Sequence, residues 1–188
     1  YPRSKHFKTF IIAGQTDLSF KTKGGFNVVR AICQERDDLV YRGEESAQFL
    51  IHGELGPERA FKIDVMHPST DNVPYAKTYT FQRILEQIIA TFAFEPVLDP
   101  QKRCPNLVLA GGYNLPALLP AYSIIDGILL PSFVSQTPRQ KRKGITPTIG
   151  FWVIEVVFDE KTKELKNVKP TLYNLTHYQL REDYLNDV

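Results

Sequence analysis

Four histidines are the first residues to consider for chemistry, and the placement of His67 alone favours a functional site. His67 follows the apolar run 60–66, so we expect it in a loop directly after a buried strand, where functional residues often lie. His6 and His177 lie near the ends of the sequence, and His52 ends another predicted strand. A histidine in such a loop commonly only hydrogen-bonds the backbone, so a structural and a functional role both remain open.

Two carboxylates on neighbouring predicted strands form a second candidate. Asp126 and Glu155 could hold magnesium as in nucleases of the Asp…Glu-x-Lys type. The lysine of that pattern is replaced by Val157, and the solvent face of an alternating hairpin explains Glu155 more simply. The sequence contains no P-loop, G-x-S-x-G, H-E-x-x-H or C-x-x-C pattern, so any chemistry is expected on loops.

A basic run at 139–143 (RQKRK) is the third candidate, with four positive charges in five residues. Such a run can bind the phosphates of a nucleic acid, and Tyr113 and Phe133 are near enough in sequence to complete a groove. A solvated surface loop is the alternative. The predicted phosphate or nucleic-acid contacts are Arg139, Lys141, Arg142 and Lys143.

The composition predicts one domain covering residues 1–188, in which 171–188 form a peripheral C-terminal tail. The chain has 188 residues, 43% of them hydrophobic, and a net charge of +2, which suits a single core and excludes a disordered chain. No apolar run approaches the length of a membrane span. Cys33 and Cys104 are too few for a disulfide scaffold or a thiolate zinc site. We therefore expect a soluble protein of a reducing, cytoplasmic compartment.

The elements that must position these residues can be read from hydrophobic periodicity. An apolar stripe with helical spacing predicts a helix over 78–92, and a weaker one predicts a helix over 26–33. Alternating or continuous apolar runs predict strands over 7–13, 39–41, 47–52, 60–66, 107–110 and 124–130, followed by a long hairpin from Gly150. We expect a loop from Gly14 and another in the Pro- and Leu-rich segment before 124. The expected fold is α/β (α+β), a mixed sheet with few helices.

Taken together, these loops and strands have the order found in the calcineurin-like metallophosphoesterases, and the sequence resembles that superfamily from its third motif onward. FIIAGQTDLSF resembles the strand that leads to G-N-H-D, and IDVMHPSTDNVPYAKTYTFQRILE resembles the strand, metal-binding histidine and helix that follow. LVLAGGYNLPALLPAY resembles the strand that leads to G-H-x-H. Some members of the superfamily have a later segment that reads Q-T-P, then basic residues and K-G, then a Gly-Trp strand. The sequence ILLPSFVSQTPRQKRKGITPTIGFWVIEVVF resembles that segment.

The resemblance implies an αββα sandwich whose strand-end loops hold two divalent metals that activate water against a phosphate ester. Carried over residue by residue, it places Gln15 at the metal-binding asparagine, Thr16 at the histidine of G-N-H-D and His67 at the isolated metal histidine. Gly112 and Asn114 occupy the two histidine positions of G-H-x-H. The implied metal residues are therefore His67, Gln15 and Asn114, the last two through their amide oxygens.

Replacing the metal-binding side chains in this way removes most of the binding energy of a two-metal site. The resemblance therefore implies a catalytically degenerate domain, for which we expect no cofactor. The alternative is a metal-dependent phosphodiesterase or nuclease, weakly binding manganese or zinc, whose remaining ligands come from a preceding segment or a partner chain. The D-x-H and G-D motifs have no counterpart in this sequence, which implies an N-terminally truncated sandwich with an open sheet edge. We expect a protein partner or a second copy to cover that edge, and nucleic acid is a further possible partner.

Overall fold

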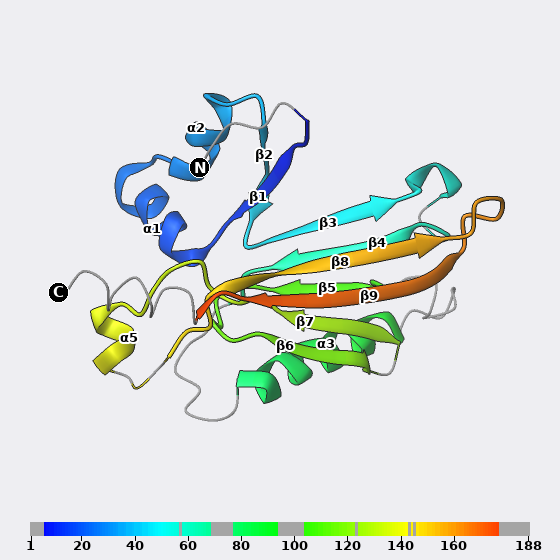
Figure 1. Cartoon of the computed structure of the whole chain (residues 1–188). Coiled ribbons are helices and arrows are strands. Elements are labelled where there is room, and N and C mark those ends of the chain that lie inside the picture. Colours follow the sequence, from blue (N-terminus) through cyan, green and yellow to red (C-terminus); the bar gives the residue numbers. More distant parts are fainter. Residues whose placement is uncertain are drawn as a thin grey trace.

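The computed structural model describes residues 6–56, 58–68, 77–93, 104–122, 124–142, 144 and 146–176 (Figure 1). The strands are β1 (Thr9–Ala13), β2 (Leu39–Glu44), β3 (Ser46–Ile51), β4 (Phe61–Met66), β5 (Leu107–Ala110), β6 (Ala117–Tyr122), β7 (Ile125–Leu129), β8 (Gly150–Phe158) and β9 (Leu165–Asn174). The helices are α1 (Gln15–Gly24), α2 (Val28–Gln34), α3 (Lys77–Ala93) and α5 (Pro138–Arg142), with a 3₁₀ turn η1 (Gly53–Leu55). The protein therefore has the expected mixed α/β fold.

The main sheet of the described residues has five strands in the order β3-β4-β5-β7-β6. The three central strands are parallel, with Ile63 opposite Leu107 and Leu107 opposite Asp126. The outer strands β3 and β6 run antiparallel to their neighbours. The carboxyl ends of β4, β5 and β7 therefore meet at one edge of the sheet, the place where α/β proteins usually bind ligands.

Helix α3 covers one face of this sheet. Its apolar stripe buries Phe81 and Leu85 completely against Val108, Ile125 and Leu129. The helix spans the residues for which the apolar periodicity predicted it. Burying two large side chains of this kind contributes several kcal/mol, of the order of 2 to 3 for each.

The hairpin β8–β9 covers the opposite face. Trp152, Ile154, Val156 and Phe158 alternate along β8 and pack against Phe61, Leu107 and Ile128. The Trp152 indole Nε1 donates a hydrogen bond of 3.0 Å to the Leu129 carbonyl oxygen, which links the hairpin to the main sheet. The layers are therefore α3, the main sheet and the hairpin (Figure 1).

Strands β1 and β2 form a parallel pair beside these layers, with Thr9 opposite Leu39. The guanidinium of Arg42 on β2 lies over the rings of Phe10 on β1 and Phe49 on β3, at 4.9 and 5.7 Å from their centroids. Arg42 thereby connects the pair to the edge of the main sheet through cation–π contacts. Helices α1 and α2 lie on the β1–β2 side of the molecule (Figure 1).

Four sequence predictions need correction. The segment after Gly14 was expected to be a loop and forms α1, while the Pro- and Leu-rich segment before 124 contains the edge strand β6. The basic run was treated as a loop, but 138–142 is the short helix α5. Residues 171–174, assigned to the peripheral tail, pair with β8 as the end of β9. Residues 177–188 of that tail, His177 among them, lie outside the described residues.

Both cysteines are buried and unbonded, as expected for small apolar side chains, and burial raises the pKa of each thiol. No helix within the described ranges is long and apolar enough to cross a membrane.

Candidate functional site at the carboxyl ends of the strands

His67 lies at the point where three strand ends converge. Its backbone N–H donates a 2.7 Å hydrogen bond to the carbonyl of Glu45, which joins β2 to β3. Glu45 in turn donates from its own N–H to the Ala13 carbonyl at the end of β1, at 2.8 Å. The N–H of Gly111, which follows β5, donates to the Met66 carbonyl at 2.9 Å. The backbone therefore fixes the ends of β1, β4 and β5 around one histidine.

Two glycines enclose the imidazole of His67. A β-carbon on Gly14 would lie 3.0 to 3.1 Å from three ring carbons, and one on Gly112 would lie 3.0 Å from Cε1 and Nε2. Both distances are at the limit of what real β-carbons adopt, and Gly112 also has a φ of +86° that disfavours other residues. The ring is thus held between backbone segments. We call Gly14, His67 and Gly112 the glycine–histidine cluster.

The cluster contains a polar atom with no visible partner. The Nδ1 of His67 is buried and makes no hydrogen bond to any described residue, and the same holds for the Tyr113 hydroxyl. Burying a polar group without a hydrogen bond is costly, and such groups are rare in folded proteins. The nitrogen therefore marks the cluster as a place where a polar atom from elsewhere would be stabilising.

The other two predicted metal residues lie on segments that meet at this cluster. Gln15 is the first residue of α1, next to Gly14, and its side chain is exposed. Asn114, two residues after Gly112, has a φ of 57°, and its carbonyl accepts a 3.1 Å hydrogen bond from the Thr148 N–H. The structure thus brings together the backbones of the three segments that the sequence singled out.

The side chains present do not fit a two-metal centre. Nowhere in the described ranges do three or more His, Cys, Asp or Glu side chains lie close enough to hold a metal ion. Asp17, which matches the aspartate of G-N-H-D, accepts a 3.0 Å hydrogen bond from the Gly14 N–H and so caps the start of α1. A single imidazole with amide oxygens is a poor ligand set for manganese or zinc.

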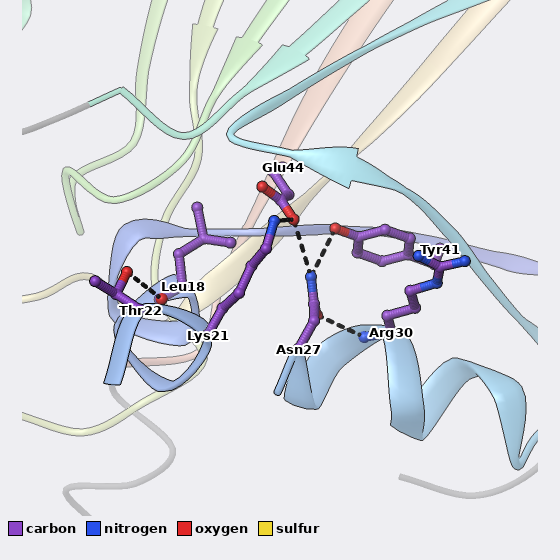
Figure 2. A network of polar contacts seen from close by, with 7 residues as sticks. All are labelled: Leu18, Lys21, Thr22, Asn27, Arg30, Tyr41 and Glu44. Carbon is purple, nitrogen blue, oxygen red and sulfur yellow. Dashed lines mark hydrogen bonds and ion pairs between the residues drawn. The ribbon is translucent and has the colours of Figure 1, made fainter. Parts of the chain in front are cut away.

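A polar network positions α1 and α2 beside this edge (Figure 2). Lys21 forms a 2.6 Å ion pair with Glu44, and the Asn27 amide donates to both Glu44 and the Tyr41 hydroxyl at 3.2 and 3.0 Å. The Asn27 side chain also accepts from the Arg30 N–H at 2.9 Å, which caps α2. The hydrogen bond from Lys21 lowers the pKa of Glu44. The network holds both helices against β2. It thereby also positions Gly14, which directly precedes α1.

Lys77 ties α3 to the same edge. Its Nζ donates a hydrogen bond to the backbone carbonyl of Tyr113, next to Gly112. Burial lowers the pKa of this lysine, as expected for a cation that loses water. The start of α3 is therefore fixed to the loop that covers His67.

The basic run follows β7 at the same end of the molecule (Figure 1). Helix α5 is capped by reciprocal hydrogen bonds between Thr137 and Gln140, at 2.7 and 3.3 Å. Lys141 and Arg142 on this helix are exposed. Arg139 lies on it too, and Lys143 lies outside the described residues. Tyr113, expected to complete a groove, is instead 3% exposed within the core.

The magnesium alternative is not supported by the sheet arrangement. Asp126 lies on β7 of the main sheet, whereas Glu155 lies on β8 of the separate hairpin, so the expectation of neighbouring strands was wrong. Glu155 pairs with Lys169 across the hairpin at 3.7 Å, and its carboxylate is largely exposed. It belongs to the solvent face, as the hairpin alternation suggested.

One feature of this end was missed by the sequence analysis, a stack of three aromatic rings. Phe151 lies parallel to Tyr173 at 5.1 Å between ring centroids and parallel to Phe133 at 6.3 Å, with interplanar angles of 8° and 10°. Phe151 and Tyr173 face each other across the hairpin. The register of the β8–β9 hairpin, which sets Phe151 opposite Tyr173, is the signal that would have revealed this pair of rings. We call Phe133, Phe151 and Tyr173 the aromatic stack.

Comparison with protein-family models and with curated proteins finds no match to this sequence. The relationship to metallophosphoesterases therefore stays a prediction from the motifs.

Proposed function

We propose that this chain is a catalytically degenerate metallophosphoesterase-like domain that acts as a binding or assembly subunit. The main support for this proposal is the glycine–histidine cluster. Its three residues come from the segments that resemble three metal-binding motifs of the superfamily, yet Gly112 contributes backbone where the motif has an imidazole. A retained arrangement of loops without its ligand side chains is suited to binding rather than to metal-assisted hydrolysis.

The layer order supports the same proposal. A helix, a mixed sheet and a second β layer are three of the four layers of an αββα sandwich. The outer face of β8–β9 exposes 41% of Val153 and 48% of Val157. An apolar sheet face of this kind is suited to a protein partner or a second copy of the chain.

The test measures metal content and phosphodiesterase activity on one sample. The purified chain is dialysed against manganese and zinc, analysed for bound metal and assayed with a bis-aryl phosphodiester. We expect substoichiometric metal and no turnover. Near-stoichiometric metal with turnover that disappears in His67→Ala, but persists in the strand-end control His52→Ala, would overturn the proposal.

That contrary result would favour the alternative, a metal-dependent phosphodiesterase or nuclease completed by further ligands. The buried Nδ1 of His67, which has no partner among the described residues, is the observation in its favour. Metal binding without turnover would be consistent with the assembly role, and it would indicate that Nδ1 of His67 binds a structural metal ion.

A further inference from the structure

We propose that the aromatic stack and helix α5 form a binding surface for single-stranded nucleic acid. This inference names a partner for the proposed binding function and rests on it. Proteins that bind single strands combine aromatic rings, on which bases stack, with cations that follow the phosphate backbone. Both components lie at this end of the molecule.

The stack offers flat ring faces to solvent. Phe133 is 73% exposed and Tyr173 is 47% exposed, although both are large aromatic side chains. Phe151 between them is half-buried, so it orders the stack while the outer rings stay accessible. A base can continue the stack on the free face of either outer ring, because every base presents a π-face.

The backbone holds the stack in place. The Ser132 N–H donates to the Thr148 carbonyl at 2.8 Å, and the Gly150 N–H donates to the Ser132 carbonyl at 3.0 Å. The Ser132 hydroxyl oxygen accepts from the Val134 N–H at 3.0 Å, which closes the turn that carries Phe133. These hydrogen bonds hold the segment that carries the rings, so little side-chain or backbone ordering is needed when a base binds.

Charge decides which partner this surface fits. Residues 127–154, which contain Phe133, Phe151 and all of α5, carry four cations and no aspartate or glutamate. The rest of the chain has more acidic than basic residues. Lys141 and Arg142 are exposed, and the nearest carboxylate along β8, Glu155, is paired with Lys169. A locally positive, aromatic surface matches a phosphate backbone with accessible bases better than an apolar protein face.

The spacing suits a short single strand. Phe133 and Pro138 are five positions apart in the sequence and α5 is helical, so Arg142 lies no more than about 24 Å from Phe133 along the backbone. Known single-strand sites cover about 4 to 16 nucleotides. A strand of this length can place bases on the rings while its phosphates meet Lys141 and Arg142.

The experiment measures fluorescence anisotropy of labelled dodecathymidylate, dodecauridylate and a 12-base-pair DNA duplex with the full chain. We expect both single strands to bind more tightly than the duplex. Phe133→Ala and Tyr173→Ala should each weaken single-strand binding about 5- to 100-fold. The matched control Tyr79→Ala removes a ring on α3 whose exposure of 57% lies between those of Phe133 and Tyr173, and it should leave the affinity unchanged.

The charge component is tested separately. The double variant Lys141→Gln, Arg142→Gln should lower the salt slope of single-strand binding by about 1.4. The control double variant Arg83→Gln, Lys161→Gln removes two exposed cations elsewhere and should keep the slope. Circular dichroism on every variant separates loss of binding from loss of fold.

Three results would overturn the inference. They are no binding of either oligonucleotide at low salt, equal affinity of Phe133→Ala and the native chain, and a preference for the duplex that no ring substitution alters. A concentration-dependent dimer that Phe133→Ala abolishes, without oligonucleotide binding, would assign the stack to self-association instead. None of these results depends on metal content or turnover, so a failure of this inference can be told apart from a failure of the proposed function.

Discussion

Three ring carbons of His67 lie 3.0 to 3.1 Å from the position that a β-carbon on Gly14 would occupy. Cγ and Cδ2 are bonded to each other and Cε1 lies across the ring from them, so nearly equal distances to all three mean that the added carbon would meet the face of the imidazole. The end of β1 and the loop after β4 are therefore in contact at a position where a residue without a β-carbon is needed.

We expect Gly14→Ala to destabilise the protein by about 1 to 3 kcal/mol, because the new methyl group must displace either the ring or the backbone. Urea unfolding followed by far-UV circular dichroism gives the change in the free energy of unfolding. Gly24→Ala is the matched control, since a β-carbon there meets nothing within 4 Å and alanine favours the helix.

A double-mutant cycle with His67→Ala tests the contact itself. If the methyl group at position 14 clashes with the imidazole, the double variant should be more stable than the sum of the single effects predicts. Additive effects within about 0.5 kcal/mol would contradict the contact.

We expect Trp152→Phe to cost about 1 to 3 kcal/mol, because it removes the donor of the hydrogen bond between the hairpin and the Leu129 carbonyl. Far-UV circular dichroism is the appropriate measurement, since the substitution removes the sole tryptophan of the chain. Val153→Thr, on the solvent-facing side of the same strand, is the control and should change stability by less than about 0.5 kcal/mol. An unchanged urea midpoint for Trp152→Phe would mean that apolar packing alone joins the two β layers.

The strands other than β6, and helix α3, could be predicted because their apolar periodicity is strong. The same reasoning placed His67, Gly14 and Gly111-Gly112 at strand ends. It could not place them in contact, because that depends on the parallel alignment of β4 with β5, with Ile63 opposite Leu107. Strand order is a property of the whole chain and leaves no local signal.

Helix α1 and strand β6 were missed for local reasons. The residues of α1 have no apolar stripe, and the helix depends on the cap between Gly14 and Asp17 and on the Lys21–Glu44 pair. Pro120 interrupts the pattern of β6, and proline is tolerated there because β6 is an edge strand of the main sheet. The aromatic stack needed the β8–β9 register, which pairs Phe151 with Tyr173.

The turn of the β8–β9 hairpin provides a prediction about pH. A hydrogen bond from Lys166, at 2.8 Å, and further bonds from the backbone of Thr162 and Lys161 lower the pKa of Asp159 from 3.8 to about 2. Because the pKa is lower in the folded state, the charged carboxylate stabilises the fold above the ordinary pKa. That contribution is lost as the pH falls from about 4 to about 2.

Asp159→Asn isolates this charge, since an amide oxygen can still accept from the two backbone N–H groups. We expect the variant to have a lower urea midpoint than the native chain near neutral pH, and the difference to vanish as the pH approaches 2. Trp152 fluorescence can follow unfolding at each pH. Glu160→Gln removes the neighbouring exposed carboxylate and serves as the control, with a smaller change in midpoint near neutral pH. A difference between Asp159→Asn and the native chain that persists unchanged at pH 2 would show that geometry, and not charge, accounts for the role of Asp159.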